Sequence, residues 1–129
     1  MIYLDTSVAL AHLLAEDRRP PASLWAEPIV SSRLLEYEVW NRLNSRGLSA
    51  SHRAPAEALI GRLAFVELFR QVLVRATESF PMPVRTLDAL HLASMDFLQK
   101  QGQRIRLASY DERLNAAAVK TGIDLLPLQ

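Results

Sequence analysis

The chain has 129 residues, with 15 Lys or Arg against 14 Asp or Glu and a formal net charge of +1, so its length permits one compact domain over residues 1–129. A composition that is 50% hydrophobic and 22% charged excludes a disordered tail, and the absence of cysteine excludes disulfide frameworks, thiolate zinc sites and thiol nucleophiles. The sequence shows no basic leader and no apolar run of about 18 residues, which predicts a cytoplasmic protein with no membrane partner.

The first half of the chain alternates short strands with helices. An apolar run at 2–4 predicts a strand, and Asp5-Thr6-Ser7 supplies helix N-cap residues for a helix over 8–15. A second strand at 27–32 ends in a serine cap. Helices are then expected at 34–46, before Gly47, and at 55–63. Residues 65–68 fit either a short strand or a helix extension.

The second half continues the same alternation. Residues 72–79 predict a helix that the prolines at 81 and 83 stop, and Thr86 is expected to cap a helix that ends at Gly102. A strand at 105–109 and a helix from Asp111 to Gly122 follow, and the proline in a last strand at 125–128 favours a sheet edge. The pattern predicts an α/β fold, a three-layer α/β/α arrangement around a central, mostly parallel sheet of four to five short strands.

Four acidic residues lie just after predicted strands or near the starts of helices, namely Asp5, Glu38, Asp88 and Asp111. Ligand sites of open parallel sheets lie at the carboxyl ends of the strands, so all four acids could face one rim. Converging carboxylates repel one another unless a cation offsets the repulsion. Carboxylates without Cys or regularly spaced His select Mg²⁺ or Mn²⁺ over zinc, and such ions act on phosphodiesters by activating water.

Each acid also has an ordinary structural interpretation. Asp5 and Asp111 are good helix caps, and Asp88 fits a surface acid favoured by the helix dipole. Glu38 is spaced to pair with Arg42 one helical turn later. Taken singly, none of the four acids establishes a metal site.

Polar side chains accompany the acids. Thr6, Ser7 and Ser109 are placed to hold a metal-bound water or a phosphate oxygen, although helix capping is the simpler role for Ser7. His91 lies one turn beyond Leu87 on an apolar stripe, which favours a satisfied, partly buried histidine over a general base.

The acids lie in four blocks of sequence, Met1–Ser7, Ser31-Ser32 with Glu38–Leu43, Arg85–Ala93 and Leu107–Leu114. Together these blocks resemble the PIN domain and, within it, the VapC-like toxin ribonucleases. Their order and approximate spacing match the family from Met1 to the closing segment at 122–127.

The resemblance implies that the four acids bind the metal, with Thr6 and Ser109 as polar support. Glu36 competes with Glu38, because both lie within or at the edge of the apolar arc of the same helix and helical geometry does not decide between them. The family pattern of a glutamate followed by an apolar pair favours Glu38.

The function that the resemblance implies is a Mg²⁺-dependent endoribonuclease, the toxin of a type II toxin–antitoxin pair. It further implies a homodimer and a cognate antitoxin whose peptide covers the acidic groove. Because the net charge is close to neutral, RNA affinity would depend on local arginines. The candidates are Arg33, Arg42, Arg85 and Arg113.

Other functions stay open. A PIN nuclease of RNA processing or quality control would need no antitoxin. A phospho-accepting receiver domain would need a lysine directly after a strand, whereas Lys100 and Lys120 both fall in predicted helices. A haloacid-dehalogenase-like phosphatase would need an acid two residues after Asp5, where Ser7 stands. A non-catalytic interaction module is the remaining alternative.

Overall fold

The computed structural model describes residues 1–128, and Gln129, the last residue of the expected domain, lies outside the described residues. Within residues 1–128, five strands form one sheet in the order β3-β2-β1-β4-β5, and every neighbouring pair is parallel. The strands are β1 (Ile2–Leu4), β2 (Ile29–Ser32), β3 (Ala64–Val66), β4 (Arg106–Ala108) and β5 (Asp124–Leu125). The expected parallel α/β sheet is therefore confirmed.

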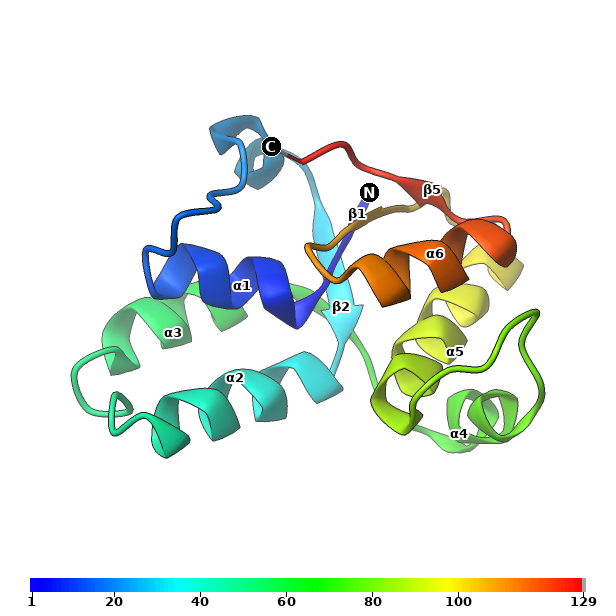
Figure 1. Ribbon diagram of the computed structural model, residues 1–129, viewed down its shortest axis with the longest axis horizontal. Coiled ribbons are helices and arrows are strands. Elements are labelled where there is room, and N and C mark those ends of the chain that lie inside the picture. The colour runs from blue at the N-terminus through cyan, green and yellow to red at the C-terminus, as the bar shows by residue number, and fades with distance from the viewer. Residues whose placement is uncertain (129) are drawn as a thin grey trace.

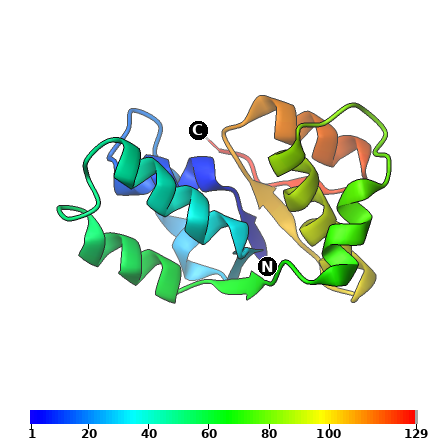
Figure 2. The same cartoon turned by 90° about the horizontal axis from the view of Figure 1, so that it is seen from below.

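Helices cover both faces of the sheet (Figure 1, Figure 2). One face carries α1 (Thr6–Leu13), α2 (Leu34–Ser45) and α3 (Arg53–Gly61). The other face carries α4 (Arg70–Thr77), α5 (Thr86–Lys100) and α6 (Glu112–Lys120). A 3₁₀ turn, η1 (Ala22–Ala26), leads into β2. The three layers agree with the predicted architecture, and no helix in the described part of the chain is long and apolar enough to cross a membrane.

Alternate residues of the strands supply the two cores. Ile2 and Leu4 pack in the cluster that includes α1, α2 and α3, whereas Tyr3 packs in the cluster that includes α4, α5 and α6. In β4, Ala108 packs in the first of these clusters and Leu107 in the second. Because both faces of these central strands are buried, their sequences are continuous apolar runs rather than alternating ones.

The central strands of the sheet position the candidate functional residues. β1 lies between β2 and β4, and the chain leaves its carboxyl end through Asp5. The Asp5 backbone N–H donates to the Ala108 carbonyl at 3.0 Å, which fixes the residue after β1 against the end of β4. Ligands of open α/β sheets bind at such a point, where connections from neighbouring strands diverge.

Several boundaries in the first half of the chain differ from the expected ones. The first helix begins at Thr6 and ends at Leu13, because Asp5 is its N-cap and Ala15 has a left-handed backbone with φ of 50°. The turn η1 was not expected. Only the first half of the ambiguous segment at 65–68 belongs to a strand. Phe65 and Val66 pair with β2, and residues 67 and 68 follow the end of β3.

Boundaries in the second half also need correction. The fourth helix ends at Thr77 rather than at 79, because Glu78 is already extended. Thr86 does not cap α5. Arg85 occupies the N-cap position in an extended conformation without a side-chain bond, and Thr86 is the first helical residue. The last strand is confirmed as an edge strand, but it ends at Leu125, so Pro127 lies beyond it and is not the reason for its position.

Candidate active site

The four acids predicted from the sequence line one depression at the carboxyl end of the sheet. Asp5 follows β1, Asp111 follows β4, Glu38 comes from α2 and Asp88 lies in the first turn of α5. The depression has a volume of about 770 Å³ and is also lined by Thr6, Ser7, His91 and Tyr110. The structure therefore brings together side chains that lie more than 100 residues apart in the sequence.

Asp5 is held through one of its two carboxylate oxygens. The residue is only 7% exposed, and its Oδ2 accepts hydrogen bonds from Ser7 N at 3.3 Å, Ser7 Oγ at 2.6 Å and Ser109 Oγ at 2.8 Å. No residue in the range 1–128 donates to Oδ1. Asp5 therefore caps α1 with one oxygen while the other stays available, so the capping role and a role in chemistry are compatible.

Two serines connect the ends of β1 and β4. Ser7 was expected to cap a helix, but it lies inside α1 and its hydroxyl accepts from the Tyr110 backbone N–H at 3.0 Å. Ser109 donates to Asp5 and accepts from the Asp111 backbone N–H at 2.9 Å. These two hydroxyls fix Asp5 relative to the segment that carries Asp111.

Glu38 is also held through one oxygen. Its Oε1 accepts from Thr6 Oγ1 at 2.9 Å and lies 2.8 Å from Nε2 of His91. His91 is only 2% exposed, and its Nδ1 lies 2.7 Å from the Tyr3 hydroxyl. The expectation of a satisfied histidine is confirmed, and the alternative pairing of Glu38 with Arg42 is absent from the described ion pairs.

The choice between Glu38 and Glu36 is clear in the structure. Glu36 pairs with Arg33 at 3.3 Å and does not line the acidic depression. Arg33 also donates to Glu67 at 2.6 Å, which fixes this group of charges next to β3. Of the two glutamates, Glu38 is therefore the one that faces the other acids.

Asp88 and Asp111 complete the four predicted acids, and Glu16, which the sequence did not indicate, also lines the depression. Burial, followed by the negative charges of Asp111 and Asp5, raises the pKa of the Asp88 carboxyl above its ordinary value. Asp111 caps α6 through Oδ1, which accepts from Arg113 N at 2.9 Å and Leu114 N at 3.2 Å. The shift at Asp88 shows that the acids interact electrostatically across the depression.

Burial alone would lower the pKa of His91, but the hydrogen bond with Glu38 and the charges of Asp5, Glu38 and Asp88 raise it above the ordinary value. The imidazole therefore experiences the same negative field as Asp88. Both side chains therefore lie within reach of the negative charges of the neighbouring carboxylates.

Basic side chains line the same depression without forming ion pairs with the four acids. In residues 1–128, no Lys or Arg lies within ion-pair distance of the four acids. Arg42, Arg85 and Arg113 line the depression as expected, and so does Arg18, which the sequence reasoning missed. Arg33, a fourth arginine predicted to contact RNA, does not, because Glu67 and Glu36 bind its guanidinium.

The donor set suits a hard divalent cation. Asp5 and Glu38 each keep one carboxylate oxygen without a protein donor among the described residues, and such oxygens are the ligands that Mg²⁺ and Mn²⁺ prefer. No three acidic or histidine side chains of residues 1–128 already converge on one ion position. The residues therefore fit a cation in their chemistry.

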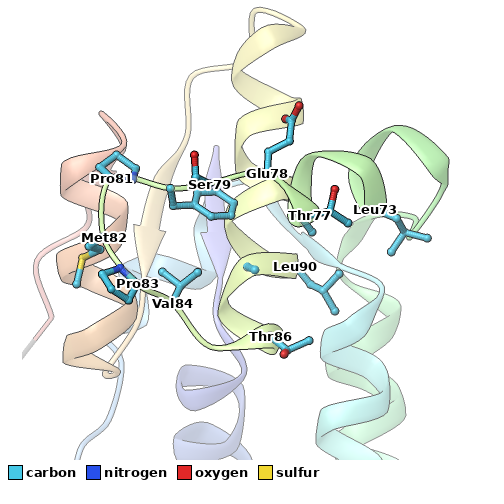
Figure 3. Close-up of a pocket in the computed structure, with 13 residues that line it drawn as sticks. Leu73, Thr77, Glu78, Ser79, Pro81, Met82, Pro83, Val84, Thr86 and Leu90 are labelled. Carbon is cyan, nitrogen blue, oxygen red and sulfur yellow. The ribbon is translucent and has the colours of Figure 1, made fainter.

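A second depression has a different character. It has a volume of about 720 Å³ and lies between α4, the segment 78–85 and α5 (Figure 3). Its lining is mainly apolar, with Leu73, Val84 and Leu90 on its walls and Glu78 as the one charged residue among the described ones. The acidic depression is therefore the candidate active site.

Comparisons with known proteins agree with this arrangement. Residues 2–120 match the family model of the PIN domain. The chain belongs to the PIN domain family. It is 32% identical to "Ribonuclease VapC46" of Mycobacterium tuberculosis over 129 residues, which cover 97% of this chain and 95% of that protein. Within the family the chain is therefore VapC-like, as the sequence blocks predicted, and the receiver-like and dehalogenase-like alternatives are excluded.

A solved structure shares the fold. The crystal structure of VapC20 from Mycobacterium tuberculosis, described as a sarcin-ricin loop cleaving toxin, aligns with a TM-score of 0.68 at 22% identity. The alignment covers 91% of this chain and 95% of VapC20.

Proposed function

We propose that this protein is an endoribonuclease and the toxin of a type II toxin–antitoxin pair, acting in the cytoplasm. The observation that carries the proposal is the meeting of four carboxylates around one depression, with no Lys or Arg of residues 1–128 within ion-pair distance of them. The four are Asp5, Glu38, Asp88 and Asp111. The names of the relatives support the chemistry, since VapC46 is called a ribonuclease and VapC20 a toxin that cleaves the sarcin-ricin loop.

Asp5, Glu38, Asp88 and Asp111 would hold Mg²⁺ or Mn²⁺ in this proposal. A bound ion would supply an activated water and stabilise the negative charge that develops on the phosphodiester. Ser109 holds Asp5, and Thr6 holds Glu38, each through a hydrogen bond to one carboxylate oxygen. These two hydroxyls thereby orient the other oxygen of each acid.

The arginines at the rim are proposed to bind the RNA backbone. Arg42, Arg85, Arg113 and Arg18 line the depression, and guanidinium groups bind phosphate oxygens well. We do not include Arg33, because Glu67 and Glu36 already bind its guanidinium.

The proposed partners are a second copy of the chain and a cognate antitoxin. Carboxylates that have no Lys or Arg partner among residues 1–128 offer a binding place for a basic side chain of an antitoxin peptide, which would also exclude RNA. The homodimer is proposed from the likeness to VapC-like proteins.

The test of the enzymatic proposal is RNA cleavage by the purified protein before and after chelation. Cleavage is expected to disappear when divalent metal is removed and to return with Mg²⁺ or Mn²⁺, because the donors are hard oxygens. Cleavage that persists in excess chelator would contradict the carboxylate and metal chemistry.

The test of the biological proposal is expression of the chain alone in a bacterial host. Growth should stop, and coexpression of a DNA-binding protein encoded next to it should restore growth. A chain that cleaves RNA but is harmless and has no copurifying partner would instead be a PIN nuclease of RNA processing or quality control.

A further inference from the structure

A chain of hydrogen bonds connects the buried core to Glu38. The Tyr3 hydroxyl lies 2.7 Å from His91 Nδ1, and His91 Nε2 lies 2.8 Å from Glu38 Oε1. Tyr3 is completely buried in β1 and His91 is buried in α5, whereas Glu38 comes from α2 on the opposite face of the sheet. These hydrogen bonds therefore link both helical layers at the carboxyl edge of the sheet.

The donors in this chain have one consistent direction. The Ser32 backbone N–H donates to the Tyr3 oxygen at 3.2 Å, which leaves the Tyr3 hydrogen free to point at His91 Nδ1. Burial raises the pKa of the Tyr3 hydroxyl, so it keeps that hydrogen. A neutral imidazole that accepts at Nδ1 carries its proton on Nε2 and donates to Glu38. The imidazolium also donates from Nε2, so the bond to Glu38 has the same direction in both states.

Packing of the core does not by itself require these hydrogen bonds. Two buried aliphatic side chains would pack between β1 and α5 without any need for hydrogen bonds, whereas buried polar groups are costly unless they are paired. Here the pairing ends on a carboxylate that is 23% exposed and lines the depression. Thr6 donates to the same oxygen, so both donors act on Oε1 and leave Oε2 for another ligand.

We propose that Tyr3 and His91 are positioning residues, which hold the Glu38 carboxylate so that Oε2 is presented to a divalent cation. This inference rests on the proposed function, in which Glu38 is a metal ligand. A glutamate has several rotatable bonds, and fixing one oxygen before the ion arrives lowers the ordering cost of binding. Donors behind metal ligands commonly contribute about 10- to 100-fold in metal affinity.

The test compares His91→Gln with His91→Asn and adds Tyr3→Phe, with Mn²⁺ affinity measured by calorimetry on folded protein. The Gln amide nitrogen can take the place of Nε2, whereas the Asn amide can replace only Nδ1. We therefore expect His91→Asn and Tyr3→Phe to weaken Mn²⁺ binding by about 10- to 100-fold and His91→Gln to retain most of the affinity. The control is the same pair of substitutions at His12, which is exposed on α1 against Trp25. His12→Gln and His12→Asn should not change the Mn²⁺ affinity.

Equal Mn²⁺ affinity in the wild type, His91→Asn and Tyr3→Phe would overturn the inference, and so would equal losses in His91→Asn and His91→Gln. If His91→Asn does not fold, Tyr3→Phe decides, because it removes a single buried hydroxyl.

A second measurement separates this inference from the proposed function. If the wild type binds no Mn²⁺, the proposed function fails, and ¹⁵N NMR of the His91 ring still tests the positioning chain. The wild-type ring should carry a proton on Nε2, and Tyr3→Phe should weaken that tautomer preference. A wild-type ring with its proton on Nδ1 alone, or a tautomer indifferent to Tyr3→Phe, would overturn the inference.

Discussion

Two groups of charged side chains in this protein are paired differently. Next to β3, Arg33 binds Glu67 at 2.6 Å and Glu36 at 3.3 Å, and its guanidinium lies 4.1 Å from the centre of the Phe65 ring. We call this group the Arg33 cluster. In the acidic depression, no Lys or Arg of the described chain pairs with any of the four acids.

The difference indicates which group is built for a ligand. In the Arg33 cluster one guanidinium pairs with both carboxylates, so each acid already has a basic partner. In the depression, hydroxyl donors from Ser7, Ser109 and Thr6 orient Asp5 and Glu38 without cancelling their charge. Asp5 and Glu38 therefore each keep one oxygen without a protein donor in the described chain, and a cation or a basic side chain from outside would pair with it.

The largest effect is expected from Asp5→Asn. Asn remains a good N-cap, so the fold should survive, and loss of one charge should leave the metal-free protein as stable as the wild type or more so. RNA cleavage should fall by about 100-fold or more, because a metal contributes several kcal/mol of transition-state stabilisation. The melting shift on adding Mg²⁺ should shrink as well, since a weaker Kd gives less stabilisation of the native state.

Asp124→Asn, on the exposed edge strand β5, is the matched control for this charge change and should cleave like the wild type. A folded Asp5→Asn protein with the wild-type cleavage rate and Mg²⁺ shift would contradict the role of Asp5 and weaken that of the other acids.

The next prediction compares substitutions of two glutamates that lie two residues apart on α2. Glu38→Gln should weaken Mn²⁺ binding by about tenfold or more and reduce cleavage accordingly, because it removes a charged oxygen from the depression. Glu36→Gln affects only the Arg33 cluster and should leave both quantities near the wild-type values. Calorimetry and cleavage rates on the two variants measure the contrast, and the reverse ranking would make Glu36 the ligand.

A smaller effect is expected at the arginines. Arg42→Ala should weaken RNA binding similarly for all sequences and reduce the slope of log affinity against log salt by about one, since it removes one phosphate contact. Arg33→Ala should leave the slope unchanged, because its guanidinium is already bound by Glu67 and Glu36. Fluorescence anisotropy at several salt concentrations tests both variants. Equal losses of slope would show that RNA also covers the Arg33 cluster.

The sequence predicts the sheet and the position of the acids because these depend on local patterns. The strands predicted at 2–4 and 105–109 contain β1 and β4. An acid directly after a parallel strand, as Asp5 is, reaches the carboxyl edge of the sheet whatever its neighbours are. The spacing of Asp88 and His91, three residues apart, was a local sign that α5 directs both toward the depression.

The remaining features depend on contacts between distant segments. Arg33 was predicted to bind RNA, but Glu67, 34 residues away, binds it once β3 pairs with β2. Which oxygen of Glu38 is occupied depends on Thr6 and on His91, which are 32 and 53 residues away. Side-chain pairings of this range follow from the packed fold and not from periodicity.

The smallest effect is expected from Glu67→Gln, which breaks the Arg33 cluster without touching the depression. Glu67 is 59% exposed, and exposed pairs are weakened by water and salt, so the melting temperature should fall only slightly and less at high salt. The Arg33 hydrogen bond lowers the pKa of Glu67 below its ordinary value, so the stabilisation exists above that ordinary value and is lost as the pH falls through the lowered pKa. Melting curves of wild type and Glu67→Gln should therefore differ slightly at neutral pH and coincide in acid. Cleavage and Mn²⁺ affinity should not change, and a loss comparable to that of Asp5→Asn would mean that the two charge groups act as one site.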